Sequence, residues 1–260
     1  MSKLSPILEA SAVHDRRMMS VWLALTFSAG MVNTLTFLAC QRFVTHVTGT
    51  LTQIGADYAR PLLLLDYLLV TLSFVLGALL SYRLIDGRRV RGKEPWPTVP
   101  LFLVSGALTL VAGFGLLGVF GPFGQTVETS GDFLLLAILA FSMGLQNASV
   151  ATTTGMIVRT THMTGPLTDF SIALGAYLSP APPAIRETAR TSAKLRGMKI
   201  LSFVVGCAAA AVIGPRLHYA AYVVPSALVG LAGWWLRTHL QLLVPVDEAA
   251  EGVPGGPLPA

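Results

Sequence analysis

The stretch THMTGPLTD, residues 161–169, is a polar segment in a strongly apolar chain, and it directly follows an uncharged run at residues 133–158 and Arg159-Thr160. A closely similar stretch, THVTGTLTQ at residues 45–53, follows the first long apolar run of the same chain. A polar phrase that recurs at the end of two hydrophobic segments indicates an internal duplication. We therefore expect the two phrases to decide both the fold and the position of a functional site.

The composition of the chain indicates a membrane protein. Of its 260 residues, 53% are hydrophobic and only 12% are charged, against about 25% charged residues in ordinary soluble domains. A membrane-crossing helix needs about 20 mostly apolar residues. Long uncharged runs cover residues 18–41, 67–82, 98–126, 133–158, 200–215 and 217–236. The sequence therefore predicts an all-α, polytopic transmembrane helical bundle of about six spans.

The basic residues are distributed by topology. With six spans and the N-terminus inside, most Lys and Arg residues fall on one side and few on the other, which is the positive-inside pattern of the cytoplasmic face. The cytoplasmic set is Lys3, Arg16, Arg17, Arg83, Arg88, Arg89, Arg91, Lys93, Arg186, Arg190, Lys194, Arg196, Lys199 and Arg237, and the opposite set is Arg42, Arg60 and Arg216. We expect a multi-pass inner-membrane protein with both termini cytoplasmic. The net charge of +5 is then a topology signal, and no nucleic-acid partner is expected.

The two halves of the chain resemble each other beyond the polar phrase. FSAGMVN at residues 27–33 matches FSMGLQN at 141–147 with an offset of 114, and the phrase follows with an offset of 116. SFVLG at 73–77 then matches SFVVG at 202–206. Each unit holds three spans, so the second unit enters the membrane from the opposite face. Inverted three-span repeats are the architecture of many secondary transporters.

The repeats divide the chain into expected segments. These are a cytoplasmic N-terminal segment (1–17), a first three-span repeat (18–120), an extracytoplasmic connection (121–131), a second three-span repeat (132–240) and a disordered cytoplasmic tail (241–260). We expect a broken or re-entrant helix after spans 1 and 4, with the polar phrase at the join, because Gly, Thr and Pro interrupt the apolar pattern there. Gly77 and Gly206 are expected to be packing contacts between helices.

Candidate site residues follow from the polar positions near the two joins. An amide or charged group within an apolar span is costly unless a partner satisfies it. The expected substrate-binding set is Asn33, Thr45, His46, Thr48, Gly49 and Gln53 in the first half, with Gln146, Asn147, Thr161, His162, Thr164, Gly165 and Asp169 in the second. His46 and His162 have two interpretations: hydrogen bonds between helices, or binding of a ligand or proton. Arg159 is expected to pair with Asp169 or to face the cytoplasmic interface, and Asp57 and Asp66 to lie at the interface near Arg60.

Signals for catalysis or for a cofactor are weak. The sequence has none of the HExxH, GxSxG, CxxC or P-loop motifs, and the spacing of His46, His162 and Asp169 specifies no known metal geometry. Cys40 and Cys207 both lie in apolar runs and are expected to behave as small hydrophobic residues. We therefore expect neither an enzyme nor a cofactor or metal.

At these residues the sequence resembles the YoaK family of bacterial membrane proteins. The resemblance rests on FSAGMVNTLTFL (27–38) with THVTGTLTQIG (45–55), and on GLQNA (144–148) with RTTHMTGPLTDFSIALG (159–175), and it covers roughly residues 18–240. It implies a polytopic protein suggested to move small metabolites. Asn33 stands where an aspartate is common in that family, and Thr50 and Pro166 stand where asparagine is expected. These departures put proton coupling through the first repeat in doubt.

We therefore expect an integral membrane protein that transports a small solute by alternating access between two inverted repeats. Its expected partners are the lipid bilayer and the solute, and a homo-oligomer is left open. Two alternatives use the same residues differently. A channel would use the polar joins as a constriction, and a structural or regulatory membrane partner would bind no solute at all.

Overall fold

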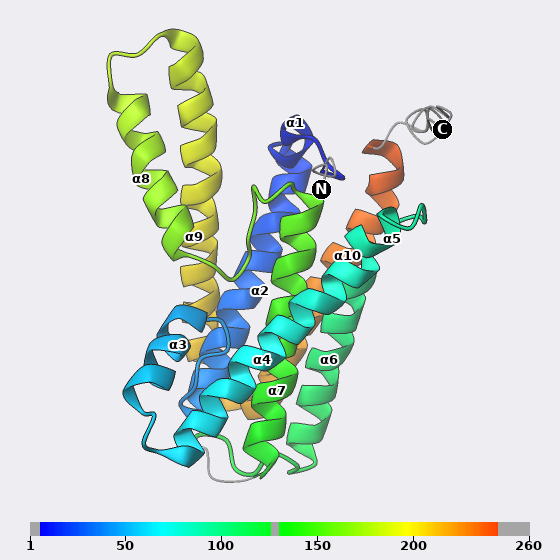
Figure 1. The fold of residues 1–260 in the computed structure, drawn as a ribbon, viewed down its shortest axis with the longest axis vertical. Helices are drawn as coiled ribbons and strands as arrows, with labels where there is room; N and C mark the ends of the chain where they lie inside the picture. Colours follow the sequence, from blue (N-terminus) through cyan, green and yellow to red (C-terminus); the bar gives the residue numbers. More distant parts are fainter. Residues whose placement is uncertain (1–5, 126–129, 244–260) are drawn as a thin grey trace, which may run out of the picture.

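The computed structural model describes residues 6–125 and 130–243, and all regular structure in this part of the chain is helical. Figure 1 shows a bundle of long helices with two shorter helices, α3 and α8, on one side. The elements are α1 (Ala10–Val13), α2 (Arg16–Cys40), α3 (Val47–Ala56), α4 (Pro61–Leu84), α5 (Asp86–Arg89), α6 (Val99–Leu116), α7 (Ser130–Thr153), α8 (Thr164–Leu178), α9 (Pro183–Leu217), the 3-10 helix η1 (His218–Tyr222) and α10 (Val223–Leu243).

Local sequence signals account for the ends of the long helices. The side chain of Asp15 caps α2 by accepting the backbone N–H of Arg17 at 2.8 Å, as a short acidic residue does at a helix start. The helix stops at Gln41, whose φ of 57° is left-handed, a common helix end. α4 begins with Pro61, where a residue without an N–H interrupts no helical bond.

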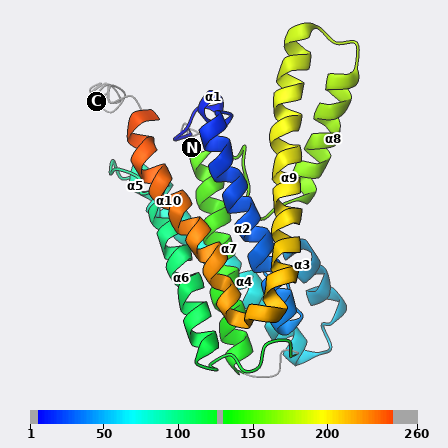
Figure 2. The same ribbon diagram turned by 180° about the vertical axis from the view of Figure 1, so that it is seen from behind.

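The described helices are those of a multi-pass membrane protein. Five stretches are long and apolar enough to cross a membrane, and the last of them, Pro183–Leu240, contains α9, η1 and α10. In Figure 2, α9 and α10 run in opposite directions on either side of η1. α4 leaves large apolar side chains exposed, among them Leu62 (74%) and Leu76 (57%), as expected of a surface that faces lipid.

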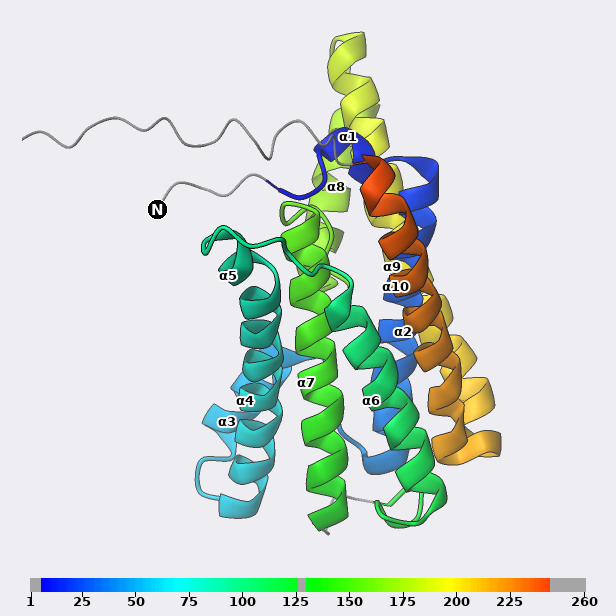
Figure 3. The ribbon, with the colours of Figure 1, turned by 90° about the vertical axis from the view of Figure 1, so that its right-hand side faces the viewer.

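Helices α2 and α7 form the centre of the bundle. α2 packs mainly against α9, and α7 packs mainly against α4, while α6 and α10 pack against each other and against α7 and α2 respectively. Figure 3 shows α7 between α4 and α6, with α10 beside α6. The same helix pairs result if α2 is exchanged with α7, α4 with α9 and α6 with α10.

Four glycines bring the packed helices together backbone to backbone. A Cβ added at Gly206 of α9 would overlap the carbonyl oxygen of Phe27 in α2, and a Cβ at Gly77 of α4 would overlap that of Phe141 in α7. In the reverse direction, Gly30 meets the carbonyl of Phe203, and Gly144 meets that of Phe74. The prediction that Gly77 and Gly206 are packing contacts is confirmed.

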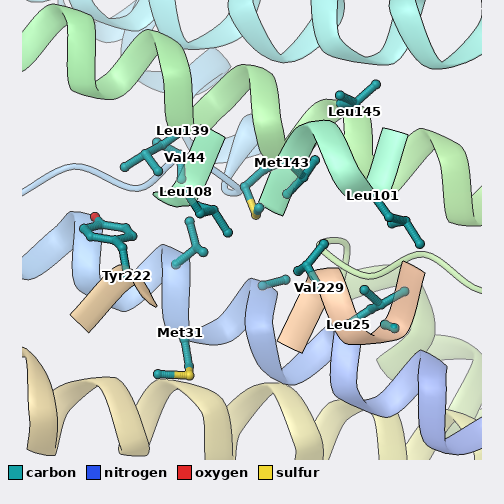
Figure 4. Packing of buried hydrophobic residues seen from close by; sticks show 14 of the residues in the cluster. Leu25, Met31, Val44, Leu101, Leu108, Leu139, Met143, Leu145, Tyr222 and Val229 are labelled. Carbon is teal, nitrogen blue, oxygen red and sulfur yellow. The ribbon is translucent and has the colours of Figure 1, made fainter. Parts of the chain in front are cut away.

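The hydrophobic core lies between α2, α6, α7 and α10. Figure 4 shows Leu25 and Met31 of α2 with Met143 of α7, Leu108 of α6 and Val229 of α10. All five side chains are at most 1% exposed. The core is therefore built from both halves of the chain, so neither half has a complete core of its own.

The prediction for the fifth span differs from the structure. The apolar run begins at residue 200, but α9 begins at Pro183 and continues for 35 residues. Its first half is polar and pairs with α8; together they form the hairpin that projects at the top of Figure 1. Tertiary pairing with α8 therefore extends the helix beyond the apolar segment that hydropathy identifies.

The ends of the described chain lie together. α1 and the last turn of α10 are at the same end of the bundle as α5 (Figures 1 and 2). α10 reaches Leu243, past the predicted start of the tail at residue 241, and the rest of that tail lies outside the described residues. The predicted connection at 121–131 is also partly outside them.

Candidate functional site

Both polar phrases are tied back to the long helix that precedes them. Asn33 of α2 accepts the backbone N–H of Thr45 through Oδ1 at 3.2 Å, and Asn147 of α7 accepts that of Thr161 in the same way, also at 3.2 Å. Each loop therefore returns along its helix instead of leaving the bundle. The short helix that follows begins near the middle of the molecule.

The two short helices run in opposite directions from that level. In Figure 1, α3 runs from the middle of the molecule toward its lower end, and α8 runs toward the upper end. The residues before them, His46 and Met163, make no side-chain cap bond to the first turns. The partial positive charge of the α3 start is therefore available there, whereas at the start of α8 the N–H of Gly165 is bound by His162 Nε2 and Pro166 has no N–H.

A cavity of about 500 Å³ lies between the two helix starts. This size is within the range of about 300–1,000 Å³ that is usual for small-ligand sites. The cavity is lined by residues 45–49 of the first phrase, residues 161–164 of the second, and Phe74, Asn147, Arg159, Ile200, Phe203 and Val204. Residues more than a hundred positions apart in the sequence thus surround one space.

Most of the predicted site residues lie on this cavity. From the first half, the structure brings there Thr45, His46, Thr48 and Gly49. From the second half, it brings there Asn147, Thr161, His162 and Thr164. Both histidines are exposed on the protein surface that borders the cavity, and His162 Nε2 accepts the backbone N–H of Gly165 at 3.2 Å.

Five predicted residues are away from this lining, and three of them border no neighbouring cavity either. Asn33 is buried behind Thr45, and Gln53 is exposed near the end of α3. Gln146 is fully buried and donates through Nε2 to the carbonyl of Leu25 at 3.0 Å and to Thr160 Oγ1 at 3.3 Å. Asn33 and Gln146 therefore hold the chain in place around the cavity without bordering it.

Gly165 and Asp169 border a second cavity of about 260 Å³, which shares Arg159 and His162 with the first. Asp169 pairs with Arg196, with 3.4 Å between Oδ2 and Nε, and not with Arg159. Its side chain is 55% exposed, so the charge is not buried within the protein. Lys199, which also borders this cavity, donates through Nζ to the carbonyl of Arg159 at 2.6 Å.

Burial and nearby charge act on His162. This residue lies in the loop between α7 and α8, outside the stretches that are candidates for spanning the membrane. Partial burial lowers the pKa of His162, and the positive charges of Arg159 and Lys199 lower it further. The neutral imidazole is therefore favoured over the protonated form relative to a free histidine.

The acidic residues of the first half separate into two pairs. Asp57 pairs with Arg60 at 3.3 Å, as expected. Asp66 is instead buried, 2% exposed, and pairs with Arg42 at 2.5 Å between Oδ2 and Nε. Asp66 therefore pairs with Arg42, two residues beyond the end of α2, and not with Arg60, while its position relative to the membrane interface stays a prediction.

Sequence reasoning did not place Arg159, Phe74 or Phe203 at the site. Phe74 and Phe203 occupy equivalent positions in the repeated SFV motif, so the repeat itself carried a signal for them. Arg159 has no such counterpart, and only the course of the loop brings it to the cavity. Within the described residues, no group of three or more His, Cys, Asp or Glu side chains could hold a metal ion.

Comparison with known proteins identifies a family but no characterised relative. A family model described as a protein of unknown function, DUF1275, matches residues 21–235. No curated protein and no solved structure matches the chain. The matched residues include both polar phrases and most or all of each candidate spanning helix.

Proposed function

The chain belongs to the DUF1275 family, an uncharacterised family consistent with the YoaK resemblance, and we propose that it is a carrier for a small solute. The single observation that carries the proposal is the cavity between α3 and α8, with both copies of the polar phrase in its wall. Solute sites of secondary transporters are formed in this way, where discontinuous helices from two repeats meet.

Inverted repeats are the architectural part of the proposal. We take α2 to α6 as one unit and α7 to α10 as the other, with six crossings in all. Three sets of equivalent contacts support it: the asparagine bonds to Thr45 and Thr161, the glycine contacts at Gly77 and Gly206, and the pairing of α2 with α9 and of α4 with α7. The asparagine bonds lie within each unit and the other two sets lie between the units, and such equivalent contacts are the expected product of a duplication.

Alternating access is the mechanism that such a symmetry allows. If the two units exchange conformations, the molecule opens to the other side of the membrane at similar energy, because equivalent contacts replace one another. The cavity stays between the units while α3 and α8 change their tilt against α4 and α9. A population of both states requires that neither is favoured by more than a few kcal/mol, roughly the range of measured two-state equilibria.

Topology is the first point to test. Single cysteines at Lys93 and Gln125, in a chain with Cys40 and Cys207 replaced by alanine, are labelled with a membrane-impermeant maleimide on right-side-out and inside-out vesicles. Both positions are exposed, and an odd number of crossings between them predicts labelling from opposite sides. Labelling from the same side would contradict the inverted repeat.

Transport is tested by counterflow in proteoliposomes. Solutes that raise the thermal stability of the purified protein are selected first, because a ligand of the native state raises its apparent stability. A carrier should then exchange external labelled solute for internal unlabelled solute, with saturation. We expect the double variant His46→Ala, His162→Ala to lose exchange. His14→Ala, directly after α1 and outside the cavity, should retain it.

The two alternatives give different results in the same vesicles. A flux that does not depend on the internal solute and that rises linearly with the external solute concentration would indicate a channel. Stability and flux that stay unchanged with every solute, and in the double variant, would indicate a protein without transport function.

A further inference from the structure

The charge around the site is positive. Arg159 is the charged side chain in the lining of the larger cavity, and that lining contains no carboxylate. The adjoining cavity shares Arg159 and adds Arg196 and Lys199, with Asp169 as its carboxylate. Because Asp169 is paired with Arg196, the cations outnumber the anions in the linings of both cavities.

Several uncharged groups of the lining can donate hydrogen bonds. The start of α3 presents backbone N–H groups without a side-chain cap from His46, and such helix starts bind anions. The start of α8 offers fewer, because the N–H of Gly165 is bound by His162 Nε2 and Pro166 has no N–H. Asn147 uses its Oδ1 for the backbone of Thr161, which leaves its Nδ2, a donor, for a ligand. Arg159 adds the planar fork that binds a carboxylate or phosphate through two hydrogen bonds.

A buried hydroxyl at the same place lacks a partner. Thr45 lines the cavity and is 8% exposed, and its Oγ1 is buried without a hydrogen bond to any described residue. Such atoms are rare in folded proteins, since the great majority of buried polar groups are paired. A ligand with an acceptor oxygen would satisfy Thr45, so this hydroxyl points to a group that the protein does not itself supply.

The rest of the cavity wall is apolar. Phe74 and Phe203 come from equivalent positions of the two halves, and Ile200 and Val204 lie beside Phe203 on α9. These side chains suit a hydrocarbon or aromatic body and offer it no hydrogen bonds. The cavity is therefore polar and electropositive at the helix starts and hydrophobic next to them.

We propose that the solute is a small organic anion, whose oxyanion group binds Arg159 and the start of α3 and whose apolar body contacts Phe74 and Phe203. The statement that the bound anion is a transported solute rests on the proposed function. The statement that an organic anion binds in this cavity is a separate claim. The oxyanion group is a carboxylate or a phosphate monoester, and the choice between them is made by experiment.

The test compares probes of equal shape and different charge. Thermal unfolding of the purified full chain is measured with benzoate, phenyl phosphate, inorganic phosphate and the neutral benzamide, at constant ionic strength. We expect saturable stabilisation by benzoate or phenyl phosphate and little by benzamide. Benzoate alone identifies a carboxylate site, and phenyl phosphate alone identifies a phosphate site. Stabilisation by inorganic phosphate alone would contradict the apolar half of the proposal.

Variants connect the binding to named groups. Arg159→Gln should weaken the apparent affinity for the stabilising probe about ten- to a hundredfold, the range for a hydrogen bond to a charged group. Arg237→Gln, on exposed α10 surface away from the cavity, is the matched control and should leave affinity unchanged. Equal stabilisation by benzamide, or full affinity in Arg159→Gln, would overturn the proposal.

Thr45→Val separates a ligand-binding hydroxyl from a structural one. The unbound protein should keep its stability, because an unpaired hydroxyl is replaced by a methyl group of the same shape, while affinity for the anion falls. Thr36→Val is the control: its hydroxyl donates to Val32 O at 2.7 Å and is 3.2 Å from Tyr222 Oη, so stability should fall and affinity should not. The reverse pattern at Thr45 would count against its role.

The failure of this inference differs from the failure of the carrier proposal. Counterflow of a neutral or cationic solute, without binding of the anionic probes, removes the anion site and keeps the carrier. Binding of anions that depends on Arg159, without any flux in vesicles, keeps the anion site and removes the carrier.

Discussion

One added methyl group at Gly206 would test the central helix pairing of this protein. In Gly206→Ala, the new Cβ overlaps the carbonyl oxygen of Phe27 and lies 2.9 Å from the carbonyl carbon of that residue. Both are backbone atoms of α2, so they cannot rotate away as the end of a flexible side chain would. α2 and α9 must therefore move apart.

The size of the effect follows from this geometry. Carbon atoms in favourable contact are about 3.5–4.0 Å apart, so the helices must separate locally by roughly 0.5–1 Å. Overpacking of this kind costs about 1–3 kcal/mol. Alanine gains at most about 1 kcal/mol over glycine inside a helix. We expect the free energy of unfolding to fall by about 1–2 kcal/mol.

Equilibrium unfolding in mixed micelles, followed by tryptophan fluorescence, measures this change. Gly77→Ala should lower the free energy of unfolding by a similar amount, because a Cβ added at Gly77 overlaps the carbonyl oxygen of Phe141 just as one added at Gly206 overlaps that of Phe27. Gly106→Ala is the control: Gly106 is in the middle of α6 with no atom within 4 Å of an added Cβ. If Gly206→Ala were as stable as Gly106→Ala, the close approach of α2 and α9 would be refuted. A large difference between Gly206→Ala and Gly77→Ala would refute the equivalence of the halves.

Three further predictions concern the polar groups. Asp66→Asn deprives Arg42 of its carboxylate, and we expect a loss of about 3 kcal/mol in unfolding free energy, measured in the same titration; a loss near zero would exclude the buried pair. Asn33→Ala and Asn147→Ala each leave a backbone N–H without its acceptor, so each should lower the free energy of unfolding by about 1–3 kcal/mol and reduce counterflow. Full counterflow activity in both variants would show that the loops need no hydrogen bond from these asparagines. Burial and two nearby cations lower the pKa of His162, so the folded chain binds fewer protons there than the unfolded chain, and the stabilising contribution is present above pH 6.5 and is lost as the pH falls. His162→Gln should therefore flatten the dependence of melting temperature on pH between about 5 and 7, around the ordinary histidine pKa. An unchanged pH profile would contradict this prediction.

The membrane class of this chain was predictable because hydropathy is a local property. An uncharged run such as residues 98–111 must be buried in protein or lipid wherever it lies, and α6 (Val99–Leu116) is one of the candidate spans. The repeated phrases were equally visible, since duplication leaves similar residues at a constant offset. From the phrases alone we predicted His46 and His162 near one site, and both line one cavity.

The ends and partners of several elements were not predictable in this way. α9 begins at Pro183 because its polar half pairs with α8, a contact with no hydropathy signal. Asp169 was expected to pair with Arg159 as one alternative, but its partner is Arg196 of α9. Charged side chains form ion pairs with whatever opposite charge lies nearby, and which distant segments lie near each other depends on how the helices pack.

By itself, the sequence determined that helices cross a membrane and that a polar phrase occurs twice. Only the tertiary structure decided that the two phrases meet, that Arg159 joins them and that Gly206 touches the backbone of Phe27. The physical reason is that the length of an apolar segment and the repetition of a motif are properties of the linear sequence, while a cavity exists only between packed surfaces. Its shape and charge depend on backbone contacts that no single segment contains.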